Sequence, residues 1–143
     1  MFFLKELPSR QMLDAYKERF PQMYVEEVEA ALNLLRRASV LLRLIEAYFT
    51  EHGLSQTRFL ILVVLDRELE HDGLQAKGIA DKLDISRPII TNTLKSMKED
   101  GLLTIRAHAE DGRAKCIMLT DLGREKLYAV LPEYYSIIHD FMI

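Results

Sequence analysis

Between residues 79 and 101, hydrophobic residues recur at helical spacing in two runs separated by a short turn. Ile79 and Leu83 share one face of the first run. Ser86 is a suitable N-cap residue for the second run, and Pro88 is tolerated in a first helical turn, where no backbone N–H is needed. The pattern predicts two helices joined by a turn, with the second beginning near residue 87.

The second helix of this pair is predicted to be amphipathic. Its hydrophobic positions repeat every three or four residues and should pack inward, while the opposite face carries hydrogen-bond donors and no large apolar group. Asp100-Gly101 should end the helix, because glycine tolerates the left-handed conformation common after a helix C-terminus. The inward residues are Ile90, Leu94 and Met97, and the outward residues are Arg87, Thr91, Asn92, Lys95 and Lys98.

Residues 102–108 and 114–119 favour two short strands around Asp111-Gly112, a dipeptide typical of tight hairpins. The hairpin carries basic residues on its arms and tip, next to a helix suited to the major groove of DNA. We therefore predict a mainly α fold with a small antiparallel β-wing, that is, a winged helix-turn-helix domain. The basic residues of the hairpin are Arg106, His108, Arg113 and Lys115.

The flanking segments are predicted to be helices that mediate dimerisation. Residues 22–51 form one long helical pattern whose apolar surface is wide enough to require cover on two sides. A nearly all-apolar helix should follow Ser55 through the centre of the domain, Thr120 should cap a further helix, and Pro132 should begin the last one. We expect one compact domain overall, with dimerisation helices in residues 1–50 and 121–143 and the DNA-binding region in residues 51–120.

Short motifs follow one another in a fixed order along the winged segment. Leu83-x-Ile85-Ser86-Arg87-Pro88 precedes Gly101-Leu102-Leu103, and Asp111-x-Arg113 is followed by Leu119-Thr120 and Gly123. This arrangement closely resembles the MarR/SlyA family of bacterial transcriptional regulators, specifically over residues 74–123 and more weakly over residues 22–135. The resemblance implies that the second helix enters the major groove and that Arg113 enters the adjacent minor groove, with Asp111 bracing the wing.

The net charge of −3 is unevenly distributed along the chain. Residues 1–74 sum to −3, residues 75–115 to +2, and residues 116–143 to −2. The positive excess lies in the groove-facing elements but is small, so one domain alone should bind DNA weakly. We therefore expect a homodimer on a pseudo-palindromic operator, with two-fold symmetry in protein and DNA alike.

Eleven positions are predicted to contact double-stranded DNA, although an ordinary solvated surface is the alternative for each. The positions span the start and outward face of the second helix and the basic hairpin, and base contacts cannot be assigned from sequence. They are Ser86, Arg87, Pro88, Thr91, Asn92, Lys95, Lys98, Arg106, His108, Arg113 and Lys115.

The family resemblance also implies regulation by a small aromatic or phenolic anion bound between the long helices and the winged domain. Tyr48, His52 and Arg58 lie around that junction and could hold such an effector, with core or surface roles as the alternative. The ligand would act on DNA through the geometry of the dimer. We expect a ligand-responsive repressor; activation and a winged-helix protein-interaction module without sequence-specific DNA binding remain alternatives.

Other chemistries find little support in the sequence. Cys116 is the single cysteine, which excludes an internal disulfide and suits a reducing cytoplasm. The four histidines lack metal-ligand spacing, and no Gly-rich phosphate loop, nucleophile elbow or apolar run of membrane-spanning length occurs. We predict a cytoplasmic regulator that is not an enzyme, with no metal or cofactor and no membrane contact.

Two departures from the family pattern lie at the termini. Family members usually continue beyond the position of Ile143 into a long helix that pairs with its symmetry mate, whereas residues 1–20 are an additional segment. In this segment Ser9 should cap a short helix that carries Met12 and Tyr16. We expect this helix to cover surface that the shortened C-terminal helix leaves bare.

Deleting residues 1–20 should therefore weaken the dimer, because the added helix would no longer cover apolar surface. Light scattering over a concentration series measures the change. A truncated chain that forms an unchanged, stable dimer would contradict this expectation.

Overall fold

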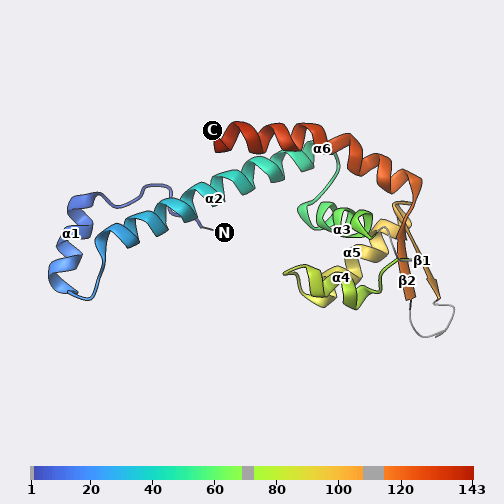
Figure 1. Ribbon diagram of the computed structural model, residues 1–143, viewed down its shortest axis with the longest axis horizontal. Helices are drawn as coiled ribbons and strands as arrows, with labels where there is room; N and C mark the ends of the chain where they lie inside the picture. The colour runs from blue at the N-terminus through green and yellow to red at the C-terminus, as the bar shows by residue number, and fades with distance from the viewer. Residues whose placement is uncertain (1, 69–72, 108–114) are drawn as a thin grey trace. The chain divides into compact units, whose positions relative to one another are not determined.

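The computed structural model describes residues 2–68, 73–107 and 115–143 of the chain (Figure 1). Most of these residues are helical, and a single antiparallel hairpin connects two of the helices. This confirms the predicted fold class. The elements are α1 (Arg10–Arg19), α2 (Val25–Glu51), α3 (Gln56–Arg67), α4 (Ala76–Lys82), α5 (Arg87–Glu99), β1 (Leu103–Ala107), β2 (Lys115–Leu119) and α6 (Asp121–Met142).

The contacts divide the chain into two compact units, Met1–Ile45 and Glu46–Ile143, which are described separately. In the first unit, Ser9 caps α1 as predicted by accepting a hydrogen bond from the Met12 backbone N–H. The ammonium of Lys17 then donates to the Pro21 and Met23 carbonyl oxygens, both at 2.6 Å. These bonds fix the turn by which the chain leaves α1 and enters α2.

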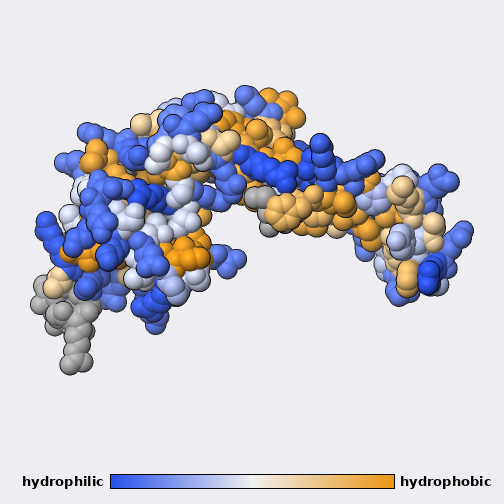
Figure 2. Space-filling model, turned by 180° about the vertical axis from the view of Figure 1, so that it is seen from behind, coloured by the Kyte–Doolittle hydropathy of each residue, from blue (hydrophilic) through white to orange (hydrophobic). Residues whose placement is uncertain are grey.

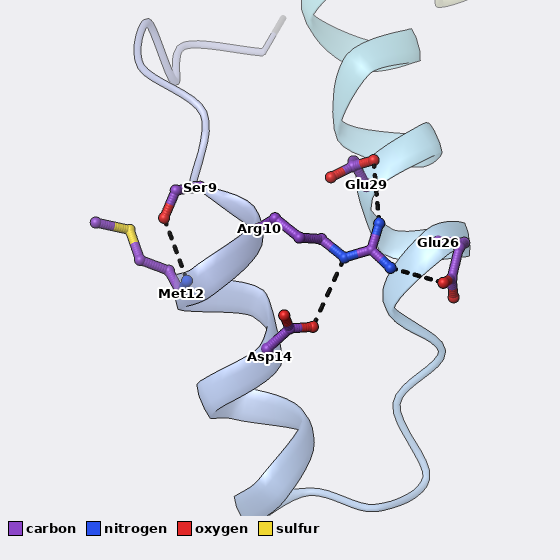
Figure 3. A network of polar contacts seen from close by, with 6 residues as sticks. All are labelled: Ser9, Arg10, Met12, Asp14, Glu26 and Glu29. Carbon is purple, nitrogen blue, oxygen red and sulfur yellow. Dashed lines mark hydrogen bonds and ion pairs between the residues drawn. The ribbon is translucent and has the colours of Figure 1, made fainter.

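Arg10 ties α1 to the first turns of α2 (Figure 3). Its guanidinium lies 2.6 Å from a carboxylate oxygen of Glu26, and 3.6 Å from both Glu29 and Asp14. A backbone hydrogen bond at the start of α2, together with Arg10, lowers the pKa of the Glu26 carboxyl. Because these groups are exposed, their main effect is to set the orientation of α1 on α2 rather than to add much stability.

The second unit is built around α3. Ile61 and Leu62 have no exposed surface, and α3 contacts α4, α5, α6 and β2. Ser55 caps the helix by accepting from the Arg58 backbone N–H at 3.1 Å. The prediction that this apolar helix runs through the centre of its unit is confirmed.

The hairpin pairs β1 with β2 in the register Leu103↔Leu119 to Ala107↔Lys115. Leu74 extends this sheet by one residue, since its backbone N–H and C=O both bond to Ile117, at 3.0 and 2.7 Å. Gly73, with φ of +114°, allows this approach, because a Cβ there would overlap the Ile117 carbonyl oxygen. The segment before α4 is thereby attached to the wing.

The end of α5 meets the start of α6 at one tightly packed junction. Gly101 ends α5 in the left-handed region, with φ of +77°, as the sequence predicted. Thr120 caps α6 by accepting from the Gly123 N–H at 3.0 Å, and its hydroxyl donates to the Gly101 carbonyl oxygen at 2.6 Å. The Thr120 N–H donates to the Leu102 carbonyl oxygen at 3.2 Å, and a Cβ at Gly123 would overlap that same oxygen.

The expected helix start at Pro132 is wrong, because α6 continues through Pro132 to Met142. Proline removes one helical hydrogen bond, but Pro132 is exposed, and both halves of the helix pack on the same core. Val130 is buried before it, and the Tyr134 ring lies 4.8 Å from that of Phe59 after it. Packing on both sides of Pro132 outweighs the lost bond.

Gly123→Ala should lower the free energy of unfolding by about 1–3 kcal/mol, because the new methyl group must displace the Leu102 backbone. Gly78→Ala is the matched control: a methyl group there meets only the flexible Leu74 side chain at 3.7 Å. That change should raise the free energy of unfolding by up to about 1 kcal/mol, since alanine favours a helix interior over glycine. Urea unfolding measures both values, and a Gly123→Ala chain as stable as the parent would contradict the packing argument.

Candidate nucleic-acid interface

The predicted inward residues of α5 are buried, but the expectation that its outward surface carries no large apolar group is wrong, because Ile89 is 51% exposed. Ile90 and Met97 have no exposed surface and Leu94 is 3% exposed, so one face is fixed in the core. The opposite face presents charged and amide side chains to solvent, while the buried face packs in the core and holds the helix in place. Its exposed residues include Arg87, Thr91, Asn92, Lys95 and Lys98.

The beginning of α5 adds backbone donors to this face. Ser86 occupies the N-cap position and Pro88 lies in the first turn, as predicted, but the Ser86 hydroxyl makes no capping hydrogen bond. The first turn contains no acidic residue, so the partial positive charge of the helix start is not offset there. Ser86, Arg87 and Pro88 are all exposed, which leaves this end of the helix accessible to a phosphate group.

The hairpin presents its two described basic residues differently. Arg106 lies opposite Cys116, and Lys115 lies opposite Ala107, so the alternation of the strands places Arg106 and Lys115 on opposite faces. Lys115 begins β2 and shares its face with the buried residue Ile117, whereas Arg106 is on the opposite face; both side chains are exposed. The sequence pattern had placed both residues in one basic surface and did not indicate this division. His108, Asp111 and Arg113 lie outside the described residues.

Two of the three residues predicted to hold an effector lie together. The Tyr48 and His52 rings are 4.5 Å apart, and His52 Nδ1 lies 2.9 Å from the Tyr48 carbonyl oxygen. The Tyr48 hydroxyl donates to the Val130 carbonyl oxygen of α6 at 2.8 Å. Burial, with the nearby Glu133 carboxylate, raises the pKa of Tyr48, so the hydroxyl remains a protonated donor at neutral pH.

Arg58, the third of these residues, contacts α5. Its guanidinium forms an ion pair with Asp100 at 2.8 Å and a hydrogen bond with the Ser96 hydroxyl. No sequence pattern indicated these contacts. Arg58 lies in α3, whereas Ser96 and Asp100 lie at the end of α5, and the packing of α3 on α5 brings them together. The polar contact between α3 and the end of α5 was therefore not predicted from the sequence.

Within the residues that the structure describes, no group of His, Cys, Asp or Glu is arranged to hold a metal ion. In the same part of the chain, no helix combines the length and apolar character needed to cross a membrane.

Comparison with known proteins gives a consistent family. A model of the MarR family matches residues 52–114. The HTH-type transcriptional repressor YetL of Bacillus subtilis is 30% identical over 139 residues, which cover 97% of this chain and 83% of YetL. The Mycobacterium tuberculosis regulator MosR in complex with DNA is 27% identical, with a TM-score of 0.62 and 78% of each chain covered.

A further solved structure shares the fold at lower identity. CouR from Rhodococcus jostii RHA1, bound to p-coumaroyl-CoA, is 19% identical with a TM-score of 0.66, over 76% of this chain and 74% of CouR.

Ser86→Ala should change the free energy of unfolding by less than about 0.5 kcal/mol, because its hydroxyl makes no capping bond, whereas Ser55→Ala should lower it by about 1 kcal/mol. Thermal or urea unfolding of the two variants gives the comparison. Equal destabilisation would mean that Ser86 caps α5 after all.

Proposed function

Because this chain belongs to the MarR family and is a DNA-binding transcriptional regulator, we propose that it represses transcription as a homodimer on a pseudo-palindromic operator. The observation that carries the proposal is α5, whose inner face is buried while its basic and amide face is exposed. Its exposed side chains include donors suited to base edges and phosphates. A regulator of chromosomal DNA in a bacterium acts in the cytoplasm.

The dimer is supported by apolar surface on α2. Leu34 is 69% exposed and Leu35 is 47% exposed, although both lie on a helix with a wide apolar surface. Figure 2 shows hydrophobic side chains at the surface along this helix. A second copy that covered them would also double the number of phosphate contacts, which the small positive excess of one chain requires.

We propose DNA contacts at the predicted positions of α5 and the wing. Ser86, Arg87 and Pro88 would approach a phosphate at the helix start, and Thr91, Asn92, Lys95 and Lys98 would face the major groove and its edges. Arg106, His108 and Lys115 would contact phosphates from the wing, with Arg113 in the minor groove and Asp111 as its brace.

A small aromatic or phenolic anion is proposed as the effector. CouR, which shares the fold, binds a coumaroyl thioester, and the paired Tyr48 and His52 rings provide an aromatic environment beside α6. Arg58 would join the site only if the anion competed with Asp100 for its guanidinium. Such competition would give the ligand a direct effect on α5. A protein-interaction module without sequence-specific DNA binding does not account for the exposed donors of α5.

The test is a fluorescence-anisotropy titration of the full chain against duplexes tiled from the DNA upstream of its own gene and against duplexes selected from a random pool. Lys95→Ala should weaken binding to all sequences and reduce the slope of log K against log salt by about 1. Asn92→Ala should instead relax sequence preference at one position in each half-site and leave the slope unchanged. Lys5→Ala, an exposed lysine in the first unit, is the control and should change neither.

Equal affinity for selected and scrambled duplexes, unaffected by Asn92→Ala, would overturn sequence-specific binding and favour a protein partner.

A further inference from the structure

Arg58 occupies an unusual position for a charged side chain in this unit. It lies in the first turn of the central helix α3, and only 19% of its side chain is exposed. Its guanidinium reaches across to α5, where it pairs with Asp100 and donates to Ser96. Although the Asp100 side chain is 56% exposed, the part-buried guanidinium has two partners on α5, which restrict it to one geometry.

Both partners lie at the end of α5. Ser96 is one turn from the C-terminus, and its backbone carbonyl accepts from the Asp100 N–H at 3.1 Å. Asp100 is the C-cap residue, where a negative charge is unfavourable because the helix dipole is also negative there. Arg58 supplies the opposing charge, so the last turn of α5 depends on a residue of another helix.

We propose that Arg58 is a positioning residue for DNA recognition: it fixes the C-terminal turn of α5 on α3 and so sets the direction in which the exposed face of α5 points. This inference rests on the proposed function, because it assumes that α5 contacts DNA. Arg58 itself does not contact DNA, since its guanidinium is directed to Asp100 and Ser96.

The chain provides a matched control at the other end of α3. Arg124 of α6 pairs with Asp66 of α3 at 3.2 Å, in the same unit and with a partly exposed side chain. The Tyr128 hydroxyl donates to the same carboxylate. Arg124→Gln removes an arginine–aspartate pair from α3 as Arg58→Gln does, but it leaves every described contact of α5 in place.

Arg58→Gln should weaken binding to a selected duplex by about five- to tenfold, because the hydrogen bonds it removes involve charged groups. The slope of log K against log salt should not change, since no phosphate contact is lost. The double variant Arg58→Gln/Asp100→Asn should bind no more weakly than Arg58→Gln alone, because both changes break the same pair. Arg124→Gln should bind like the parent chain.

Backbone amide exchange provides a reading that does not depend on DNA. The amides of Asp100, Gly101 and Leu102 donate within the final turn of α5, to Ser96, Lys98 and Met97 respectively. Arg58→Gln should accelerate their exchange severalfold while leaving the amides of α6 unchanged, and Arg124→Gln should not affect these three amides.

The outcomes separate this inference from the proposed function. If the parent chain binds no duplex specifically, the proposed function fails and amide exchange alone decides whether Arg58 positions α5. If the parent binds, unchanged affinity and exchange in Arg58→Gln would overturn the inference. A fall of about 1 in the salt slope would also overturn it, because Arg58 would then contact a phosphate directly. Equal losses in Arg58→Gln and Arg124→Gln would indicate general destabilisation and overturn it as well.

Discussion

The close packing of Gly123 against the backbone of Leu102 is the constraint on which the second unit depends. The Leu102 carbonyl oxygen accepts from Thr120, and the missing side chain at Gly123 lets the first turn of α6 lie against that carbonyl group. Because Leu102 directly follows the end of α5 and precedes β1, one contact fixes where α5 ends, where the hairpin begins and where α6 starts. The requirement for glycine at position 123 is therefore steric, because any side chain there would push α6 away from the backbone of Leu102.

The central helix α3 carries two kinds of interaction with different consequences. Ile61 and Leu62 hold the helices of this unit together without selecting a direction, because apolar burial is non-directional. The polar contacts at its ends are directional: Arg58 engages the end of α5, and Asp66 engages Arg124 and Tyr128 of α6. A helix tied to α5 at one end and to α6 at the other is suited to pass a displacement of α6 to α5, provided that both contacts persist during the movement.

Local signals in the sequence predicted most of the elements and much of the candidate interface. The inward face of α5, the glycine that ends it and the capping roles of Ser55 and Thr120 follow from residue spacing and backbone chemistry, which act over a few residues. The same local rule failed at Pro132, because the energy that keeps α6 intact comes from Tyr134 packing on Phe59, more than seventy positions away in sequence. At Pro132, tertiary packing outweighs the low intrinsic helix propensity of proline.

The polar contacts beneath the interface could not be predicted for a related reason. Arg58 was predicted to bind an anionic ligand because its position in the sequence lies near the junction of the long helices and the winged domain. A charge there can instead be paired with any opposite charge that the fold brings close. The carboxylate that meets it is that of Asp100, whose place in the sequence indicates only the end of a helix. One residue can thus end a helix through its backbone and fix that helix to its neighbour through its side chain, and only the second role requires knowledge of the packing. An anionic effector at this position would have to displace the Asp100 carboxylate from Arg58. Binding of the ligand would therefore be coupled to release of the end of α5.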